Sequence, residues 1–317
     1  MLVQVASAAP TPTAALRTWL GRPDGQPAAA MTIQVHKYHG LGNDFVLLDR
    51  RLGGGDIAAG VARALCDRRR GVGADGVLVL LPSARAALRL RIHNADGSVP
   101  EMCGNGLRCV VKHVLEATPG RPEELRVETD AGLLLARGLW RAGRLEEVEV
   151  DMGPARLVAP HLPSGATGTP HVAAPVPGTP FHGTAVSMGN PHLVVLDAPP
   201  EQAAVWGPPL ETSPGFPERT NVEFLAQEEG GLVVVVWERG VGLTQACGTG
   251  ACAALVAATL AGLVPAERTT RVRLPGGALF LRLAQDFSSI TLRGPASFVF
   301  STELPELPAP ASEAHRP

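Results

Sequence analysis

Lysine is almost absent from this 317-residue sequence, since it occurs only at Lys37 and Lys112 against twenty-six arginines. A pyridoxal-phosphate enzyme needs a lysine to hold its cofactor as a Schiff base. Lys37 precedes a glycine-rich motif, and Lys112 lies inside an apolar segment that is typical of a buried helix, so neither is well placed for that role. The sequence therefore argues against a pyridoxal-phosphate site, and no cofactor is expected.

Cysteine is also scarce. The five cysteines are Cys66, Cys103, Cys109, Cys247 and Cys252. Their odd number and uneven spacing make a poor disulfide framework for a chain of this length, which favours a reduced, cytoplasmic protein. Cys103 and Cys109 are too far apart for a CxxC zinc motif, and no second ligand pair follows them, so no metal is expected.

No block of like charge is present, because the formal net charge is -2 and only 18% of the residues are charged. This balance gives no support for binding to nucleic acid or to a membrane surface. The one long, nearly uncharged run, 157–188, is full of proline, glycine and histidine, which excludes a membrane-spanning helix there.

The two ends of the sequence differ from its middle. Residues 1–30 are rich in Ala, Pro, Thr and Gly, without the basic start and apolar core of a signal peptide. They are expected to be a disordered or non-native extension, and the fold is expected to begin near Met31. The proline-rich tail 305–317 is expected to be loose.

Between these ends, short runs rich in Val, Leu and Ile alternate with turn residues and predict many short strands. The expected strands are 32–38, 44–49, 77–81, 88–93, 125–129, 133–139, 145–151, 184–187, 192–197, 220–225, 231–237, 270–274, 278–284 and 289–293. Three segments look helical: 57–69, 104–116 and 248–263. The last two are apolar on most sides, which is typical of buried helices.

These two apolar helices open alike, with Cys103-Gly104-Asn105-Gly106 and Cys247-Gly248-Thr249-Gly250. Each follows a strand and a polar turn. The repeat predicts an internal duplication, in which two domains of similar build each wrap strands around one buried helix.

A cysteine at a helix start lies beside unpaired backbone N–H groups and the positive end of the helix dipole. That environment favours the reactive thiolate. The flanking glycines let backbone amides approach a ligand, and such amides bind carboxylates well. Two such turns face to face suit proton removal from a carbon next to a carboxylate: one thiolate abstracts the proton and the opposite thiol delivers another.

Free cysteine is more often a small buried apolar residue, and this interpretation is favoured for Cys66, Cys109 and Cys252. For Cys103 and Cys247 the glycines and the repeat favour catalysis.

Several motifs resemble the diaminopimelate epimerase family, over about 32–304. They are HGLGNDFVLLD at 39–49, GVGADG at 71–76, NADGSVPEMCGNGLRC at 94–109, GNPH at 189–192, TNVEF at 220–224 and ERGVGLTQACGTGACA at 238–253. Together they carry both cysteines in the family's order. The chain departs from the family at Leu243, where Glu is common, and at Gly76, where some members place a substrate-contacting Gln.

The resemblance implies an α/β (α+β) fold of two pseudo-symmetric domains, each a mixed sheet or barrel around a central helix, with the active site between them. The first domain would comprise 31–147 plus 293–304, and the second 148–292. The implied reaction is the cofactor-independent epimerisation of LL-2,6-diaminopimelate to meso-diaminopimelate, in lysine and cell-wall precursor biosynthesis. Diaminopimelate would be the small-molecule partner, and a homodimer is possible.

The family's functional residues carry over onto matching positions. Cys103 and Cys247 would be the two acid–base residues. The implied substrate-binding residues are Asn43, Asn94, Gly104, Asn105, Asn190, Asn221, Glu238, Arg239, Gly248 and Thr249. Among these, the amides near the cysteines would hold carboxylate oxygens, and Glu238 and Arg239 would recognise the distal end of the substrate. His192 and Glu238 would set the protonation of the thiols.

Other interpretations of these residues stay open. Asn43 and Asn94 could be ordinary turn residues. Arg239 could be a solvated surface charge, and His192 a hydrogen-bonded core histidine.

Rival functions also remain. A proline-racemase-like enzyme also uses paired cysteines, but usually has His where Asn105 stands. A racemase for another amino acid, such as histidine, would not need Arg239, whose natural partner is a second carboxylate. A related isomerase without catalytic thiols, or a binding module, would not need both cysteines.

Overall fold

The computed structural model describes residues 32–100 and 102–309. Its helices are α1 (Ala59–Cys66), α2 (Gly104–Ala117), α3 (Ser164–Thr167), α4 (Ala203–Glu211) and α5 (Gly248–Leu260), with one 3-10 turn, η2 (Pro200–Gln202). Its strands are β1 (Ile33–Gly40), β2 (Asn43–Asp49), β3 (Gly76–Leu81), β4 (Leu88–Asn94), β5 (Glu124–Thr129), β6 (Gly132–Arg141), β7 (Arg144–Asp151), β8 (Ala174–Pro175), β9 (His182–Ser187), β10 (Pro191–Val195), β11 (Asn221–Glu228), β12 (Gly231–Glu238), β13 (Gly242–Leu243), β14 (Thr270–Leu274), β15 (Gly277–Leu283), β16 (Ile290–Pro295) and β17 (Ser297–Leu304). The extension expected at 1–30, and the end of the tail from residue 310, lie outside the described residues.

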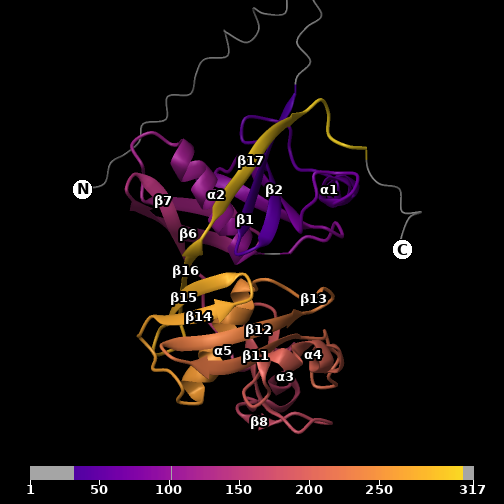
Figure 1. Ribbon diagram of the computed structural model, residues 1–317, viewed down its shortest axis with the longest axis vertical. Helices are drawn as coiled ribbons and strands as arrows, with labels where there is room; N and C mark the ends of the chain where they lie inside the picture. The colour runs from indigo at the N-terminus through magenta and orange to yellow at the C-terminus, as the bar shows by residue number, and fades with distance from the viewer. Residues whose placement is uncertain (1–31, 101, 310–317) are drawn as a thin grey trace, which may run out of the picture.

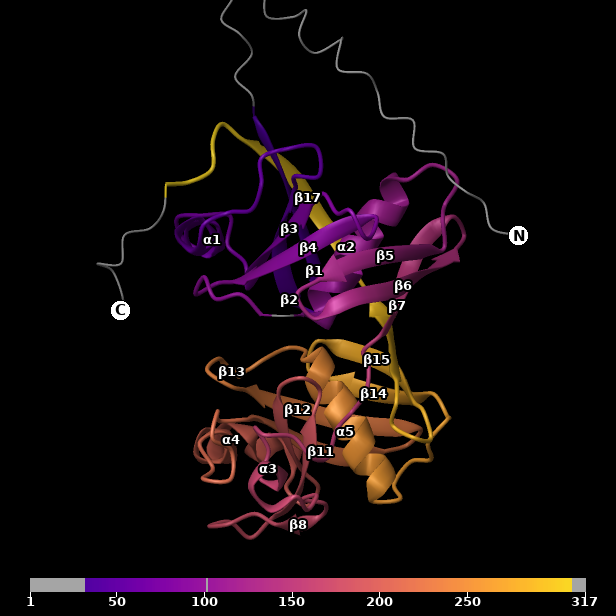
Figure 2. The same ribbon diagram turned by 180° about the vertical axis from the view of Figure 1, so that it is seen from behind.

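The chain forms two lobes, each with strands wrapped around one long helix (Figure 1). Helix α2 occupies the upper lobe and α5 the lower one, and the reverse view shows the same separation (Figure 2). Among the described residues, no helix is long and apolar enough to cross a membrane. The predicted α/β class, with two lobes around central helices, is confirmed.

The two lobes repeat one strand order. In the upper lobe β1 and β2 are antiparallel, β2 and β3 parallel, β3 and β4 antiparallel, β4 and β5 parallel, and β5, β6 and β7 antiparallel. In the lower lobe β9, β10, β11, β12, β14, β15 and β16 follow with the same succession of directions. Helix α2 lies between β4 and β5, and α5 between β12 and β14. This match confirms the internal duplication predicted from the two cysteine motifs.

One strand pairing and one returning strand join the lobes. Strand β7 of the upper lobe pairs antiparallel with β16 of the lower lobe. Strand β17 then returns to the upper lobe and pairs antiparallel with β1, as the yellow ribbon in Figure 1 shows. We propose that the domain boundaries at 147/148 and 292/293 lie within β7 and β16, so that the second domain is inserted into the first.

The central helices form because they have few polar positions to expose. The first eight residues of α2, Gly104 to Val111, are all buried, and α5 is buried from Gly250 to Ala258. Helix α1 is shorter than the predicted 57–69 because the Asp67 carboxylate accepts N–H groups of Arg69 and Arg70 in a turn. Helix α5 ends at Leu260, before the predicted residue 263, because Gly262 adopts a left-handed conformation with φ +72°.

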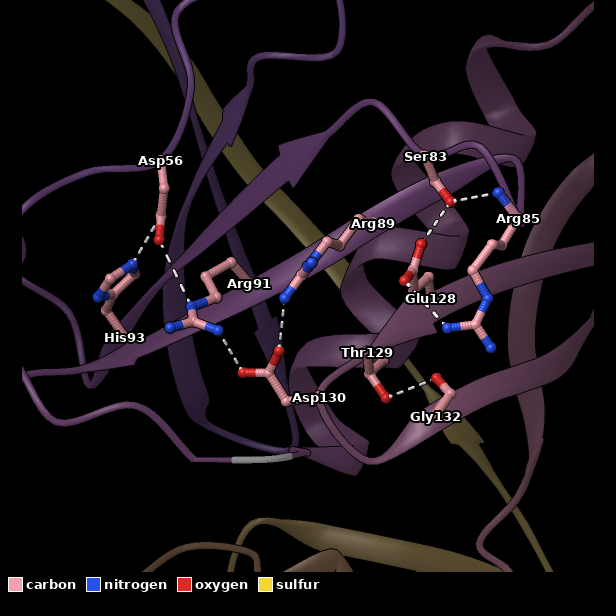
Figure 3. A network of polar contacts seen from close by, with 10 residues as sticks. All are labelled: Asp56, Ser83, Arg85, Arg89, Arg91, His93, Glu128, Thr129, Asp130 and Gly132. Atoms are coloured by element: carbon pink, nitrogen blue, oxygen red, sulfur yellow. Dashed lines mark hydrogen bonds and ion pairs between the residues drawn. The ribbon is translucent and has the colours of Figure 1, made fainter.

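A network of ion pairs braces the strand that ends at Asn94 (Figure 3). Arg89 and Arg91 of β4 both donate to Asp130 in the β5–β6 turn, at 2.9 and 2.6 Å. His93 Nε2 lies 2.9 Å from Asp56 Oδ1. A cavity of about 480 Å³ lies beside Asp56 and these arginines. Both guanidinium groups already have a carboxylate partner. The ion pairs therefore stabilise β4, and neither arginine is left unpaired for a ligand.

Candidate active site

The two cysteines are the N-caps of the two central helices. Cys103 and Cys247 both have extended backbone, with φ -141° and -116°, and the helix begins at the glycine that follows each of them. These two glycines face each other, because a Cβ built on Gly248 would lie 3.9 Å from the Cα of Gly104. The duplication therefore brings the two thiol-bearing helix starts together at the junction of the lobes.

The two thiols differ in their capping bonds: the Cys247 side chain accepts one from its own helix turn, whereas the Cys103 side chain accepts none. Gly250 N donates to Cys247 Sγ at 3.3 Å, and the Thr249 hydroxyl lies 3.5 Å from the same sulfur. Burial nevertheless raises the pKa of both thiols, although backbone N–H groups in each turn lower it. Desolvation of the charged sulfur therefore outweighs the stabilisation that the N–H groups of the helix start give to the thiolate.

Glu238 is the acidic group shared by the two thiols. It ends strand β12, and Thr244 Oγ1 donates to its Oε1 at 2.6 Å. Burial raises the pKa of this carboxyl, and its charge in turn raises the pKa of Cys247 and of Cys103. Glu238 is thus placed to influence thiol protonation, as the resemblance implies.

Asn105 connects the two halves of the site. Its side-chain amide donates to the Ala246 carbonyl, at 2.9 Å, just before Cys247, and to Asn43 Oδ1 at 3.1 Å. Its Oδ1 accepts a bond of 2.8 Å from Arg108. Because these bonds occupy the whole side chain, only the backbone N–H of Asn105 remains to hold a carboxylate.

Asn43 begins β2 and Asn94 ends β4, and β3 lies between these two upper-lobe strands. Asn43 Nδ2 donates to Asp75 Oδ2 at 2.9 Å, in addition to accepting from Asn105. Asn94 Nδ2 donates to Ser98 Oγ at 2.9 Å within its own turn, and the residue is exposed. Asn43 is therefore tied directly to the site, whereas the contacts of Asn94 are those of a turn residue.

His192 is fully buried and bonded through both ring nitrogens. Its Nδ1 lies 2.7 Å from Glu223 Oε1, and its Nε2 lies 3.0 Å from Asn190 Oδ1. The side chains of His192 and Glu223 have no exposed surface. The pair orients Asn190, the pseudo-symmetric counterpart of Asn43 in the GN dipeptide that precedes each strand.

The Asn221 side chain fixes the backbone at Arg239 by hydrogen bonding. Its Nδ2 donates to the Pro191 carbonyl at 2.9 Å, and its Oδ1 accepts from the Arg239 backbone N–H at 3.0 Å. The Arg239 guanidinium donates to the Glu218 carbonyl at 2.8 Å and remains partly exposed, with 31% of its side chain accessible. Its Nη1 also lies 3.8 Å from Glu218 Oε2, while Nε and Nη2 donate to no described residue.

Two buried charged residues near the thiols received no role from the sequence. Glu223 lies in the TNVEF motif and Arg108 in CGNGLRC. Both are fully buried. Their motifs were recognised, but neither residue could be placed beside a particular cysteine from spacing alone.

The two departures from the family pattern differ in their surroundings. Leu243 is 51% exposed on the short strand β13, so its side chain adds an apolar group to the surface. Gly76 is enclosed, because a Cβ there would lie 2.7 Å from the His93 carbonyl oxygen. Any larger residue at this position would require β4 to move.

The remaining cysteines and the lysines lie apart from this arrangement. Cys66, Cys109 and Cys252 are buried and free. Lys37 pairs with Asp44 at 2.6 Å, and Lys112 with Glu116 at 2.9 Å. In 32–100 and 102–309, no three His, Cys, Asp or Glu side chains converge as metal ligands would.

The fold is shared with solved structures of isomerases and racemases. A probable proline racemase from Agrobacterium radiobacter K84 matches with a TM-score of 0.64 and 18% identity, covering 86% of this chain and 93% of that one. A methylitaconate-delta-isomerase matches with a TM-score of 0.59 and 14% identity, covering 86% and 95%. At these identities the likeness defines the class of fold.

The sequence comparisons identify the family. The diaminopimelate epimerase family model matches residues 35–158 and 184–299. Diaminopimelate epimerase of Moorella thermoacetica is 46% identical over 278 residues, covering 85% of this chain and 98% of that protein. The enzyme of Desulforudis audaxviator is 48% identical over 277 residues, covering 84% and 98%. The chain belongs to the diaminopimelate epimerase family.

Proposed function

We propose that this protein epimerises LL-2,6-diaminopimelate to meso-diaminopimelate without a cofactor, in lysine and cell-wall precursor biosynthesis. The observation that carries the proposal is the meeting of two cysteine-capped helix starts at Gly104 and Gly248. Inversion of a carbon requires a base on one face and an acid on the other, and two opposed thiols supply both.

In the proposed reaction one thiolate takes the α-proton, leaving a carbanion whose charge spreads into the adjacent carboxylate. The opposite thiol then donates its proton to the other face of the same carbon. The substrate is neither oxidised nor reduced, and the enzyme ends with its proton on the other sulfur. Backbone N–H groups of the two helix starts are positioned to stabilise the carboxylate as it gains charge.

The remaining residues have supporting roles in this proposal. The N–H groups of Gly104, Asn105, Gly248 and Thr249 hold the reacting carboxylate. Asn43 and Asn190, which lie at matched positions of the two lobes, bind substrate polar groups, and Asn94 and Asn221 extend that set. Glu238 and Arg239 bind the distal amino and carboxylate groups, while His192 and Glu238 influence thiol protonation.

The identity of the substrate can be tested by comparing several amino acids in one deuterium-exchange assay. In heavy water the delivered hydrogen comes from a thiol that has exchanged with solvent, so the inverted product must carry deuterium at its α-carbon. We expect label in LL- and meso-diaminopimelate, measured by mass spectrometry, and little label in proline, histidine or glutamate. Faster labelling of one of these three, or inversion without label, would contradict the proposal.

Arg239 provides a test of selectivity. Its guanidinium can bind a carboxylate through two parallel N–H bonds, which a lysine ammonium cannot reproduce. Losing a charge-assisted bond costs about 1.5–3 kcal/mol, so Arg239→Lys should lower kcat/KM for diaminopimelate at least about tenfold.

The matched control is Arg219→Lys, because the Arg219 guanidinium is already paired with Glu211 at 2.8 Å. We expect its steady-state constants to stay within about twofold of the unmodified enzyme. Equal constants for Arg239→Lys and the unmodified enzyme would mean that the distal carboxylate binds elsewhere.

We also propose that the enzyme is a reduced cytoplasmic protein and forms a homodimer. All five cysteines are free, which suits a reducing compartment. Strand β17 pairs with β1 and exposes Phe298, Val299 and Phe300, which supports an apolar contact between two copies.

A further inference from the structure

The two thiols have chemically different neighbours at positions that the duplication makes equivalent. Gly106 and Gly250 are each the third residue after a catalytic cysteine. A Cβ on Gly106 would lie 2.8 Å from Leu78 Cδ2, whereas a Cβ on Gly250 would lie 2.8 Å from Glu223 Oε1. Leu78 and Glu223 are each the third residue of the corresponding strand, β3 or β11. The same place therefore holds an apolar group in one lobe and a carboxylate in the other.

The equivalent residues on the neighbouring strands, β2 and β10, also differ, one being apolar and the other polar. Phe45 pairs with Gly76 at the start of β3, and His192 pairs with Asn221 at the start of β11. Phe45 Cζ would contact a Cβ on Gly106 at 3.7 Å, while His192 Nδ1 bonds to Glu223 Oε1. A phenyl and isobutyl pair in the upper lobe thus corresponds to an imidazole and carboxylate pair in the lower one.

A third difference lies inside the helices. Arg108 is the fifth residue after Cys103, and Cys252 is the fifth after Cys247. The buried guanidinium of Arg108 donates to the Gly104 carbonyl at 3.4 Å, to Asn105 Oδ1 at 2.8 Å and to the Pro295 carbonyl at 3.2 Å. All three acceptors are neutral, and no described carboxylate pairs with this arginine. Its positive charge is therefore uncompensated beside the first turn of α2.

We propose that Arg108 and Glu223 are positioning residues that make the thiols unequal, with Cys103 the stronger acid and resting base, and Cys247 the resting proton donor. This inference rests on the proposed two-thiol function and assigns each thiol its protonation state in the enzyme without substrate. A cation stabilises a nearby thiolate, and a carboxylate destabilises one.

The groups that face each sulfur agree with this assignment. Burial raises the pKa of Cys103 most, and Glu238 raises it further, while the N–H groups of Gly106 and Asn105 and the charge of Arg108 lower it. Cys247 faces two carboxylates, Glu238 and Glu223, as well as Thr249 and Gly250 N–H. Burial first, and then these carboxylates, raise its pKa well above the ordinary value. His192 acts on Cys247 through Glu223, to which it is bonded.

The experiment measures the acidity of each thiol in the full-length enzyme without substrate. Neutral iodoacetamide is applied briefly across a series of pH values, so that each molecule carries at most one label. Mass spectrometry of the peptides then gives a midpoint pH for alkylation of each cysteine. The midpoint is used in place of the absolute rate, because unequal access scales a whole curve without moving its midpoint. We expect the midpoint of Cys103 to be lower than that of Cys247 by about one pH unit or more.

Three variants separate the causes. Arg108→Met should raise the Cys103 midpoint by about one pH unit, and Arg108→Lys should restore most of it, since the charge returns. Glu223→Gln should lower the Cys247 midpoint by a similar amount and leave Cys103 nearly unchanged. Lys112→Met is the matched control, because it removes a cation one turn further along α2 that is already paired with Glu116. It should move neither midpoint.

Equal or reversed alkylation midpoints in the unmodified enzyme would overturn the assignment. So would midpoints that stay unchanged in both Arg108→Met and Glu223→Gln. If Arg108→Met does not fold, the unmodified enzyme, Arg108→Lys and Glu223→Gln still decide the matter. Failure of the proposed function would instead leave these midpoints in place, while diaminopimelate acquired no deuterium.

Discussion

Replacing either Cys103 or Cys247 by alanine is expected to abolish measurable epimerisation. A positioned acid or base contributes on the order of 10²–10⁴-fold to the rate, and inversion needs one on each face of the carbon. In the proposed mechanism each sulfur serves one face of the carbon, because the two cysteines cap helices whose first residues meet. Chiral chromatography of the product, starting from LL-diaminopimelate, measures the loss.

Cys66→Ala is the matched control. Cys66 is a buried thiol at the end of α1, where it packs among apolar side chains of the upper lobe. Its removal should reduce stability modestly and leave kcat nearly unchanged. Full activity in either Cys103→Ala or Cys247→Ala would refute the two-base mechanism.

Mild oxidation is expected to inactivate the enzyme completely and reversibly by joining Cys103 to Cys247. The neighbouring glycines already approach closely, with 3.9 Å between the Cβ position of Gly248 and the Cα of Gly104. A disulfide needs Cα atoms roughly 4.4–6.8 Å apart, and we expect the two cysteines, each one residue before these glycines, to reach that separation. Bound substrate, lying between the sulfurs, should protect them.

Peptide mapping after oxidation measures this outcome directly. A cross-linked pair of peptides carrying Cys103 and Cys247 should appear as activity falls and disappear when a reductant restores it. The Cys103→Ala variant should yield no such pair. Loss of activity that a reductant does not reverse would indicate oxidation of one sulfur to sulfinic acid instead.

The sequence predicted the parts of this structure that follow from local pattern. The two Cys-Gly-x-Gly turns located both central helices and the duplication, because each motif combines a cap with a buried apolar run. Helix α4 was not expected, since Pro208 and Pro209 interrupt its sequence. It forms nevertheless, packing against β11 and β12 at the surface of the lower lobe. Strand β17, whose apolar residues are largely exposed, is absent from the strands that the pattern predicts, although the resemblance assigns 293–304 to the first domain.

The polar arrangement around the thiols could be predicted only in part. The resemblance supplied His192, Glu238 and the asparagines, but not their partners. Glu223 meets His192 across two neighbouring parallel strands, and Arg108 reaches Pro295 across 187 residues of sequence. Such contacts depend on strand register and on the return of the chain from the second lobe. Neither can be read from the spacing of residues within a motif.

The pairing of β1 with β17 has a consequence for how the protein is made. Ile33 lies opposite Leu304, so the first and last of the described strands, which are synthesised far apart in time, are bonded to each other. The whole lower lobe is synthesised between them and can fold while the upper lobe still lacks its final strand. Until then β1 presents an unpaired edge, which is a site for wrong pairing with another nascent chain. Completion of the upper lobe must therefore await the synthesis of β17.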